Sequence, residues 1–355
     1  MDAIDVALVH FKNQTFEIVD YEQHPIADQV RNAVRSLSLK STVEEITDLD
    51  SILGGLFANA ITKTIEKNAI SAKEISAIGS HGQTILHLPE ANRPRTLQIG
   101  DPNIIAYKTG ITTVADFRRM DMAAGGQGAP LAPAFHARYF RSEKSERVIL
   151  NIGGVANITL LPANPEAAPS GFDTGPGNGL MDDWNFKHNG TYMDKDGGWA
   201  ARGTVNPTLL AELLHDPYFS LPPPKSTGRD DFNLNWLEQK LQQLGQSIFP
   251  EDIQATLLNL TTLSIANAIN SYTSQTREVY ICGGGAHNPL LIKKLQEQLP
   301  DIHIATTEEI GIGPDAVEAV TFAWLAKCRL EGGAGNLPSV TGAKQNVMLG
   351  AVYKS

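Results

Sequence analysis

Cysteine is scarce in this sequence. Cys282 and Cys328 are the only two among 355 residues, and they lie far apart in apolar surroundings. A scaffold stabilised by disulfides needs a denser set of cysteines, so the sequence indicates no disulfide framework. We therefore expect both residues to act as small apolar side chains of the interior.

Long apolar runs and basic clusters are also missing. No stretch approaches the roughly 18 apolar residues that a membrane-spanning helix needs. The first residues lack the basic and apolar regions of a signal peptide. Acidic residues outnumber basic ones, 39 to 29, which gives a net charge of -10. These absences predict a cytoplasmic protein that binds neither membranes nor nucleic acid.

Three common motifs of cofactor chemistry are absent. The sequence has no Walker A motif, no His-Glu-x-x-His and no Cys-x-x-Cys. If the protein binds ATP, it does so without a P-loop. His287 has no second ligand at a suitable spacing, so no metal site is predicted. Phosphate ligands stay possible, because the backbone N–H groups of glycine-rich loops bind phosphate without positive charge.

The sequence does contain strands and helices that mix throughout its length, which favours an α/β architecture. Because 355 residues exceed the usual size of a single core, we expect two domains. We place domain I at residues 1–122 plus about 340–355, and domain II at 123–339. The glycine-rich segment 125–130 is the candidate hinge. The pattern predicts strands at 6–9, 16–19, 75–79, 97–100, 112–116, 148–154 and 279–282, and helices at 43–68, 104–109, 252–271, 290–299 and 314–330.

Glycine-rich turns follow two of the predicted strands, at 151–154 and at 282–285. Each turn is either a tight connection or a loop in which missing side chains let backbone N–H groups approach phosphate. The segment 151–159 also reads as a hairpin with a flexible turn. The candidate ligand-binding residues of these turns are Asn151, Gly153, Gly154, Gly283, Gly284, Gly285 and Asn288.

The strongest local signal is Gly-Phe-Asp-Thr-Gly-Pro-Gly-Asn at 171–178. An aspartate between glycines can simply end a turn. Asp-Thr-Gly also occurs in aspartic proteases, but those need a pair of aspartates and no second Asp-Thr-Gly is present. The remaining interpretation makes Asp173 an exposed carboxylate that acts as a general base.

Polar residues of the first half offer hydrogen bonds suited to a sugar. Segment 79–84 follows a predicted strand and supplies His81, Gln83 and Thr84. His81 is equally compatible with a structural role. The arginines at 118 and 119 could bind an anionic group or form an inter-domain salt bridge. Asp315 and Glu318 have the spacing of a helix capping box, which explains both residues without any function.

Ten ordered motifs resemble one family, anhydro-N-acetylmuramic acid kinase. They are Gly-Ser-His-Gly-Gln-Thr (79–84), Gln-Ile-Gly-Asp-Pro (98–102), Ala-Asp-Phe-Arg-Arg (115–119), Ala-Ala-Gly-Gly-Gln-Gly-Ala-Pro (123–130), Asn-Ile-Gly-Gly (151–154), Gly-Phe-Asp-Thr-Gly-Pro-Gly-Asn (171–178), Pro-Lys-Ser-Thr-Gly-Arg (224–229), Asp-Ile-Gln-Ala-Thr (252–256), Cys-Gly-Gly-Gly (282–285) and Thr-Gly-Ala (341–343). The order matches, and the motifs cover nearly the whole chain.

The resemblance implies an α/β, two-domain actin-like ATPase (ribonuclease H-like) fold with its active site in the inter-domain cleft. It implies ATP and Mg²⁺, with 1,6-anhydro-N-acetylmuramic acid as acceptor and N-acetylmuramic acid 6-phosphate as product of cell-wall recycling. It also implies a homodimer.

The resemblance assigns roles to individual residues. Asp173 matches the catalytic base, which would deprotonate the water that attacks C1 while O6 takes the γ-phosphoryl group. Glu318 matches a substrate-contacting glutamate, which gives it a role besides capping. With these matches the predicted nucleotide-binding set is Asp2, Asp5, Asn151, Gly153, Gly154, Gly283, Gly284, Gly285 and Asn288, and the predicted sugar-binding set is His81, Gln83, Thr84, Arg119 and Glu318.

Two positions depart from the family pattern. The chain begins at Met1-Asp2-Ala3-Ile4-Asp5, which matches only the tail of the family's N-terminal phosphate-loop motif, as in a truncated member. Met120 stands where many members have a third arginine. The alternatives to an active kinase are therefore a catalytically impaired member of the family and a sugar-binding sensor.

Overall fold

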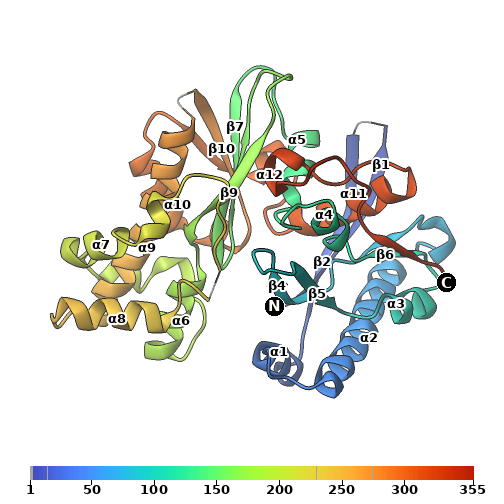
Figure 1. Ribbon diagram of the computed structural model, residues 1–355, viewed down its shortest axis with the longest axis horizontal. Coiled ribbons are helices and arrows are strands. Elements are labelled where there is room, and N and C mark those ends of the chain that lie inside the picture. Colours follow the sequence, from blue (N-terminus) through green and yellow to red (C-terminus); the bar gives the residue numbers. More distant parts are fainter. Residues whose placement is uncertain (1–2, 14, 229, 274) are drawn as a thin grey trace. The chain divides into compact units, whose positions relative to one another are not determined.

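The computed structural model describes residues 3–13, 15–228, 230–273 and 275–355 (Figure 1). The chain divides into two compact units. The first comprises Met1–Phe135 and Ala316–Ser355, and the second comprises His136–Asp315. Both units mix helices with strands, so the expected α/β architecture is confirmed.

The first unit contains three small sheets and several helices. β1 pairs antiparallel with β2, β4 pairs antiparallel with β5, and β6 pairs with both β3 and β12. The elements are β1 (Ala3–Lys12), β2 (Thr15–Pro25), α1 (Asp28–Ser36), α2 (Val43–Lys67), β3 (Ile78–Gly79), β4 (Gln83–Leu88), β5 (Arg95–Ile99), α3 (Pro102–Thr109), β6 (Thr113–Ala115), α4 (Arg119–Ala123), α5 (Ala132–Tyr139), α11 (Val317–Leu330), α12 (Pro338–Thr341) and β12 (Ala351–Tyr353).

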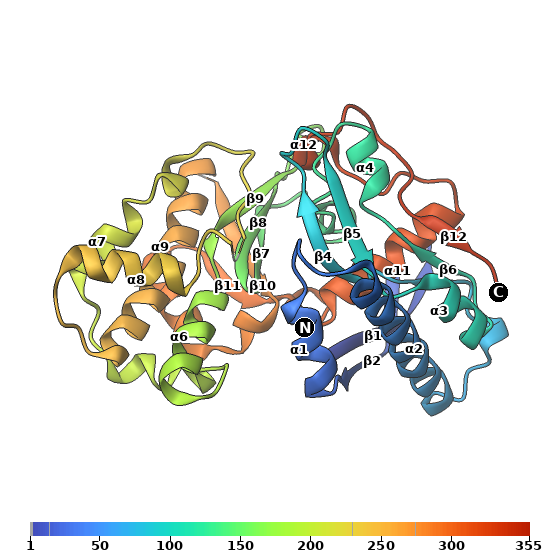
Figure 2. The ribbon, with the colours of Figure 1, turned by 60° about the horizontal axis from the view of Figure 1, so that its bottom comes forward.

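The long helix α2 begins at a capping box, in which the N-cap residue and the residue three positions later bond to each other's backbone N–H. The Thr42 side chain accepts a hydrogen bond from the N–H of Glu45, and the Glu45 carboxylate accepts one from the N–H of Thr42. The apolar face of α2 buries Leu49 and Leu53. Figure 2 shows α2 beside α3, in agreement with the contacts between these two helices. The predicted helix at 43–68 is confirmed.

A close contact joins β3 to α11. A side chain at Gly79 would place its Cβ 2.1 Å from the carbonyl oxygen of Phe322, so only glycine fits between this strand and this helix. The contact fixes the segment that follows β3, which carries His81.

The second unit is built around one five-stranded sheet in the order β11-β10-β7-β8-β9. β7 runs parallel to β10, β10 runs parallel to β11, and β8 runs antiparallel to both β7 and β9. The elements are β7 (Glu146–Ile152), β8 (Val155–Leu161), β9 (Ser170–Pro176), α6 (Gly179–Asn189), α7 (Pro207–Leu214), α8 (Leu234–Leu244), α9 (Pro250–Tyr272), β10 (Thr276–Cys282), α10 (Pro289–Gln298) and β11 (His303–Thr306).

Helix α9 forms the centre of this unit. It is buried around most of its circumference and contacts strands β8 and β9 as well as α6, α7 and α10. Figure 2 shows α6 to α9 gathered beside the sheet. A helix that is apolar on all sides is typical of a domain interior. The predicted helix at 252–271 and the strands at 148–154 and 279–282 are all present, with limits that differ by a few residues.

The limits of the two units differ from the predicted domain limits at 122/123 and about 340. The chain leaves the first unit between residues 135 and 136, within α5, and returns at Ala316. The early return has a physical cause, because α11 packs on β1, β3 and β6 of the first unit. The sequence showed α11 as an apolar helix but not which sheet it would cover.

The glycine-rich segment 125–130, predicted as a hinge, is tied down inside the first unit. The Asp121 carboxylate has no solvent exposure and accepts hydrogen bonds from the N–H of Gly128, the side-chain amide of Asn336 and the hydroxyl of Thr341, each at 2.8 Å. A Cβ at Gly126 would lie 2.2 Å from the Asp121 carboxylate. These glycines therefore serve the packing around Asp121.

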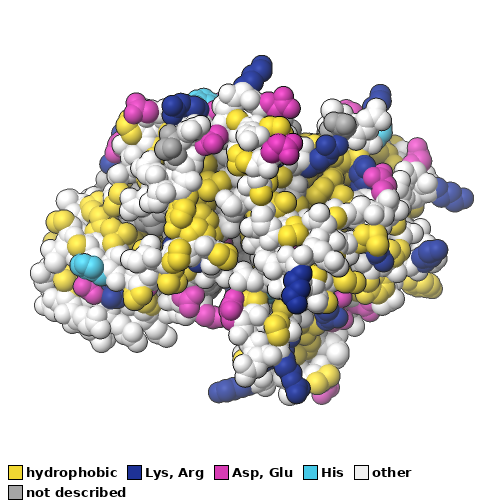
Figure 3. Space-filling view, turned by 45° about the horizontal axis from the view of Figure 1, so that its top comes forward, with side chains coloured by type: hydrophobic (Ala, Val, Ile, Leu, Met, Phe, Trp, Pro, Cys, Tyr) yellow, Lys and Arg dark blue, Asp and Glu magenta, His cyan; other side chains and the backbone are white. Residues whose placement is uncertain are grey.

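The surface carries charges of both signs. Figure 3 shows Lys and Arg side chains scattered singly over the face in view, with Asp and Glu between them. Among the helices of the described residues, none is both long and apolar enough to cross a membrane.

We predict that Asp121→Ala strongly destabilises the first unit. The substitution leaves three donors without their buried acceptor, which should lower the free energy of unfolding by about 3 kcal/mol or more. Urea unfolding measures this change. Asp48→Ala on the exposed face of α2 is the control and should stay within about 0.5 kcal/mol of the wild type. Equal midpoints for the two variants would contradict the role of Asp121.

Candidate functional site

The sheet of the second unit brings the two glycine-rich turns together. β7 and β10 are parallel neighbours, and Asn151 pairs with Cys282 at their carboxyl ends. The turn at 153–154 follows β7, and the run 283–285 follows β10. Because the carboxyl ends of parallel strands meet at one edge of a sheet, both loops lie at that edge.

The glycines of these loops divide into two kinds. At Gly283 and Gly285 a Cβ would come within 2.5 Å of the Asn151 side-chain oxygen and 2.4 Å of the Ile152 side chain, so these glycines allow the loops to pack on β7. At Gly153 and Gly284 the nearest atoms would be 3.7 and 3.8 Å away. The second kind leaves backbone accessible to a ligand.

Three backbone donors of these loops are available. The N–H groups of Gly154, Gly284 and Gly285 have no hydrogen-bond acceptor within the part of the chain that the structure describes. Unpaired backbone N–H groups can donate hydrogen bonds to an anionic phosphate, and glycine lets the phosphate come close because it has no side chain. Residues 153–154 form the turn of the antiparallel β7–β8 hairpin, so the hairpin interpretation of 151–159 is confirmed. The unpaired N–H groups at its tip and after β10 are compatible with the predicted phosphate-binding role.

Asparagines support this edge of the sheet. The N–H of Asn178 donates to the carbonyl of Gly153 at 2.8 Å, and its side-chain amide donates to the carbonyl of Ile152 at 3.3 Å. The side-chain oxygen of Asn288 caps α10 by accepting from the N–H of Leu291. Capping uses that oxygen, so a ligand at Asn288 would meet the amide nitrogen. The sequence did not assign Asn178 a role.

Asp173 lies on β9, opposite Asn157 of β8 and next to a bulge between Ala156 and Asn157. Its side chain is half-buried. One carboxylate oxygen accepts a hydrogen bond from the N–H of Thr227 at 3.0 Å. The carboxylate is thus held in one orientation on a rigid strand, and not in the simple turn that was one interpretation of its sequence.

Burial raises the pKa of Asp173 to about 6, against the Thr227 hydrogen bond, which lowers it. Nearby, the Tyr218 hydroxyl donates to the Asp173 carbonyl at 2.7 Å. Burial and the Asp173 and Asp231 carboxylates raise the pKa of Tyr218, so it stays a neutral donor. A carboxyl group with a pKa near neutrality can both take up and release a proton under physiological conditions.

The segment 225–227 is a support of Asp173 that the sequence did not reveal. The carbonyl of Lys225 accepts from the N–H of Asp173 at 3.2 Å. The Lys225 ammonium lies 4.6 Å from the centre of the Tyr218 ring and donates to the Tyr218 carbonyl. Burial lowers the pKa of Lys225. The segment belongs to one of the ten motifs, but only the fold placed it against β9.

The first unit places His81 between an arginine and an aromatic ring. Arg118 donates to His81 Nε2 from Nε at 3.2 Å and from Nη2 at 2.8 Å. The ring of Phe322 stacks on the imidazole at a centroid distance of 4.5 Å. Burial, with Arg118, holds the pKa of His81 well below its usual value. His81 is therefore a neutral ring fixed in place.

Gln83 and Thr84 begin β4, close to His81 in the chain. The Gln83 side-chain amide donates to the carbonyl of Thr84 at 3.3 Å. The Thr84 hydroxyl accepts from the Gln98 amide across the β4–β5 pair at 3.2 Å. This hydroxyl still has its own proton to donate to a ligand.

Glu318 lies close to His81, and Arg119 lies on α4. The Glu318 side chain is 74% exposed, and its carboxylate lies 3.8 Å from His81 Nδ1. The Arg119 side chain is exposed and lies 3.4 Å from the Asp116 carboxylate. The arginine that contacts His81 is Arg118, not Arg119. The sequence alone did not show which of these two adjacent arginines would make the contact.

The predicted capping box at Asp315 and Glu318 is wrong. Helix α11 begins at Val317 with Ala316 as its N-cap, and no side chain caps it. The Asp315 carboxylate instead pairs with His287 at 2.7 Å. Because α11 starts later than predicted, the Glu318 carboxylate has no capping role.

Of the two N-terminal aspartates predicted to bind nucleotide, Asp2 lies outside the described residues. Asp5 lies on β1, where its carboxylate accepts hydrogen bonds from the Tyr21 hydroxyl at 2.6 Å and the Gln23 amide at 3.0 Å. The Asp5 side chain is exposed. Its contacts hold the carboxylate in place and leave it open to solvent.

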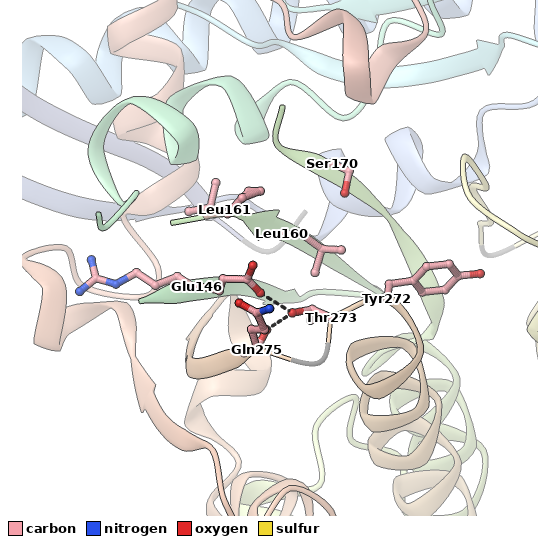
Figure 4. Close-up of a pocket in the computed structure, with 10 residues that line it drawn as sticks. Glu146, Leu160, Leu161, Ser170, Tyr272, Thr273 and Gln275 are labelled. Atoms are coloured by element: carbon pink, nitrogen blue, oxygen red, sulfur yellow. Dashed lines mark hydrogen bonds between the residues drawn. The ribbon is translucent and has the colours of Figure 1, made fainter. Parts of the chain in front are cut away.

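Metal ligands are not clustered in the described residues, where no group of three or more His, Cys, Asp or Glu could hold an ion. A cavity of about 240 Å³ lies at the starts of β7 and β10, the ends opposite the glycine loops (Figure 4). Its wall includes Glu146, which accepts from the Thr273 hydroxyl at 2.8 Å. Among the sequence-predicted site residues that the structure describes, none lines it.

Comparisons with known proteins point to one family. The family model described as "Anhydro-N-acetylmuramic acid kinase" matches residues 1–355. A protein of that name from Coxiella burnetii (strain RSA 493 / Nine Mile phase I) is 51% identical and covers 99% of this chain and 94% of its own length. Namesakes from Photobacterium profundum and Pasteurella multocida are each 48% identical over 99% of this chain, and the match covers 96% and 94% of those proteins.

Two solved structures resemble this chain at low sequence identity. An activator of 2-hydroxyisocaproyl-CoA dehydratase from Clostridium difficile with bound ADPNP is 13% identical, with a TM-score of 0.40 over 92% of this chain and 98% of that one. A ROK family glucokinase from Streptomyces griseus is 12% identical, with a TM-score of 0.38 over 91% and 99%.

We predict that Asp173→Asn stabilises the second unit above pH 6. A carboxyl group whose pKa rises from 3.8 to about 6 on folding contributes stability below pH 4 that is lost as the pH rises through 6. Asparagine cannot ionise, and its oxygen can still accept from Thr227. The variant should exceed the wild type by roughly 2–3 kcal/mol at pH 8 and equal it near pH 4.

Urea unfolding at the two pH values measures this difference. Asp301→Asn, at an exposed position, is the control and should change stability little at either pH. An Asp173→Asn protein no more stable than the wild type at pH 8 would show that the carboxylate is not strained by burial.

Proposed function

The chain belongs to the anhydro-N-acetylmuramic acid kinase family, and we propose that it uses ATP to convert 1,6-anhydro-N-acetylmuramic acid to N-acetylmuramic acid 6-phosphate. Beyond family membership, the main support for the proposal is the environment of the Asp173 carboxylate. This carboxylate is half-buried, has a pKa near 6 and accepts a hydrogen bond from the N–H of Thr227. Asp173 lies on β9, in the same sheet as the strands that the glycine loops follow.

Asp173 is proposed as the general base. Its carboxylate takes a proton from a water molecule, whose oxygen forms a bond to C1 of the sugar as the bond from C1 to O6 breaks. O6 then bonds to the γ-phosphorus of ATP as the bond to the β-phosphate oxygen breaks and ADP leaves. The Thr227 N–H leaves the second carboxylate oxygen unoccupied by any hydrogen bond among the described residues, so that oxygen is available for the proton.

The glycine loops are proposed to hold the phosphates of ATP. The support is the set of unpaired N–H groups at Gly154, Gly284 and Gly285, together with the lack of any close contact to a Cβ at Gly153 or Gly284, where the nearest atoms lie 3.7 and 3.8 Å away. Mg²⁺ bound to the phosphates would neutralise charge on the transferring group. Mg²⁺ usually keeps several waters and takes only one or two protein carboxylates. The lack of a larger acidic cluster in the described chain fits such a nucleotide-borne ion.

The sugar-binding roles of His81, Gln83, Thr84, Arg119 and Glu318 are part of this proposal. Their support is that the first unit gathers His81 with Glu318, and that Gln83 and Thr84 begin β4 two residues after His81. A cytoplasmic location, predicted from the lack of a signal peptide and a membrane span, stays a prediction. So does the homodimeric assembly that the family resemblance implies.

We predict that Asp173→Asn abolishes the kinase reaction. Removing a general base should lower kcat by roughly 10²- to 10⁴-fold, while the glycine loops still bind ATP. Assays of ADP and N-acetylmuramic acid 6-phosphate measure turnover, and calorimetry measures ATP binding. In the wild type the activity should fall below about pH 6, where Asp173 becomes protonated. Near-normal turnover by the variant would remove Asp173 from the base role.

We predict that alanine at two neighbouring glycines affects two different properties, ATP binding at one and stability at the other. A methyl group at Gly284 would come no closer than 3.8 Å to the Asn178 side-chain nitrogen, an ordinary contact, so Gly284→Ala should fold normally but raise the KM for ATP roughly tenfold by obstructing the phosphates. At Gly285 a methyl group would strike the Ile152 side chain, so Gly285→Ala should lower the unfolding midpoint. An unchanged KM for ATP in the Gly284 variant would contradict the proposed phosphate loop.

A further inference from the structure

The backbone around His81 is fixed from both sides. Gly79 packs against the carbonyl of Phe322, and Gly82 has a positive φ of 72° with room for no Cβ beside the carbonyl of Ile99. The Phe322 ring then stacks on the imidazole at an interplanar angle of 28°. The imidazole plane is therefore set by packing before any ligand binds.

Arg118 controls one edge of this ring. Two of its nitrogens, Nε and Nη2, point at His81 Nε2 at 3.2 and 2.8 Å, and Nη1 donates to the carbonyl of Gly128 at 2.8 Å. A guanidinium group has five donors and no acceptor. His81 Nε2 must therefore be the acceptor, which means that it carries no proton. In a neutral imidazole the single proton then lies on Nδ1.

We propose that Arg118 is a positioning residue that locks His81 in the neutral tautomer protonated at Nδ1, so that His81 presents one N–H donor to the sugar. The tautomer follows from the contacts alone. The sugar contact rests on the proposed function.

The Nδ1–H remains available for this contact. Its nearest charged neighbour is the Glu318 carboxylate at 3.8 Å, which exceeds hydrogen-bond length. The Glu318 side chain is largely exposed. Arg118 on one edge and Glu318 on the other are the charged groups next to the ring, and Phe322 covers a face. Burial and Arg118 both keep the pKa of His81 low, which is consistent with a neutral ring.

A fixed N–H donor selects the chemistry of its partner. It fits an oxygen that can accept, and it fits best an oxygen without a hydrogen of its own, such as that of a carboxylate, a carbonyl or an ether. An anhydro sugar with an acidic substituent and an acetamido group offers all three kinds. A free-spinning histidine could present either a donor or an acceptor, and Arg118 removes that choice.

The first experiment reads the tautomer directly. Long-range ¹H–¹⁵N spectra of protein with labelled histidine, recorded at pH 7 without nucleotide or sugar, distinguish a protonated Nδ1 from a protonated Nε2. His81 is assigned among the nine histidines by comparison with a His81→Gln sample. We expect the Nδ1–H pattern in the wild type, unchanged between pH 5.5 and 8. An Nε2–H pattern or an imidazolium signal in the folded wild type overturns the proposal.

The two adjacent arginines supply a matched pair of variants. Arg118→Met should release Nε2, and the His81 signal should change to the Nε2–H form or titrate. Arg119→Met, one residue along, should leave the His81 pattern as in the wild type, because Arg119 pairs with Asp116. Arg118→Lys, which keeps a donor, should restore part of the Nδ1–H population. The same His81 spectrum in the Arg118→Met and wild-type proteins also overturns the proposal.

Kinetics then test the sugar contact. For Arg118→Met we expect kcat/KM for the anhydro sugar to fall roughly 10- to 100-fold, mainly through a higher KM, with the KM for ATP unchanged. An unchanged KM for the sugar would refute the contact even if the tautomer is correct. Wild-type protein without kinase activity would refute the proposed function, whereas the spectra would still decide the tautomer.

Discussion

The parallel pairing of β7 with β10 is the constraint on which the site in the second unit depends. Asn151 pairs with Cys282 in this register, so both glycine loops emerge at one edge of the sheet. Gly283 and Gly285 then make the contact close, since any side chain there would collide with Asn151 or Ile152. Each loop directly follows its strand, so the pairing register of β7 and β10 sets the position of its N–H groups. A shift of that register would move the two loops apart.

Asp173 shows how the same sheet tunes a reactive group. Its strand, β9, sets the position of the carboxylate, and segment 225–227 supplies one N–H donor. Burial favours the neutral form more strongly than this hydrogen bond favours the ionised form, and the pKa rises to about 6 as a result. A base at that pKa is ionised at neutral pH and still accepts a proton readily. The stability lost by keeping it ionised is a trade of folding free energy for reactivity.

Arginines and aspartates that look alike in the sequence have different environments in the fold. Arg118 contacts His81 and the carbonyl of Gly128, while the side chain of Arg119 is exposed. Asp121, which no motif marked for a role, lies fully buried and binds three donors that hold the glycine-rich segment predicted as a hinge. In each case burial decides the role, and burial depends on which distant segments pack nearby.

The sequence by itself determined the family, the α/β class, the long helices α2 and α9, the strands β7 and β10 and the candidate base Asp173, because these depend on periodicity and on local motifs. Tertiary structure alone decided the unit limits, since α11 packs on the sheets of the first unit. It also decided the start of α11, the contact of Arg118 with His81 and the support of Asp173 by Thr227. The packing of α11 and the contacts of Arg118 and Thr227 bring together residues far apart in the chain. Their spacing in the sequence does not show how close they lie in space.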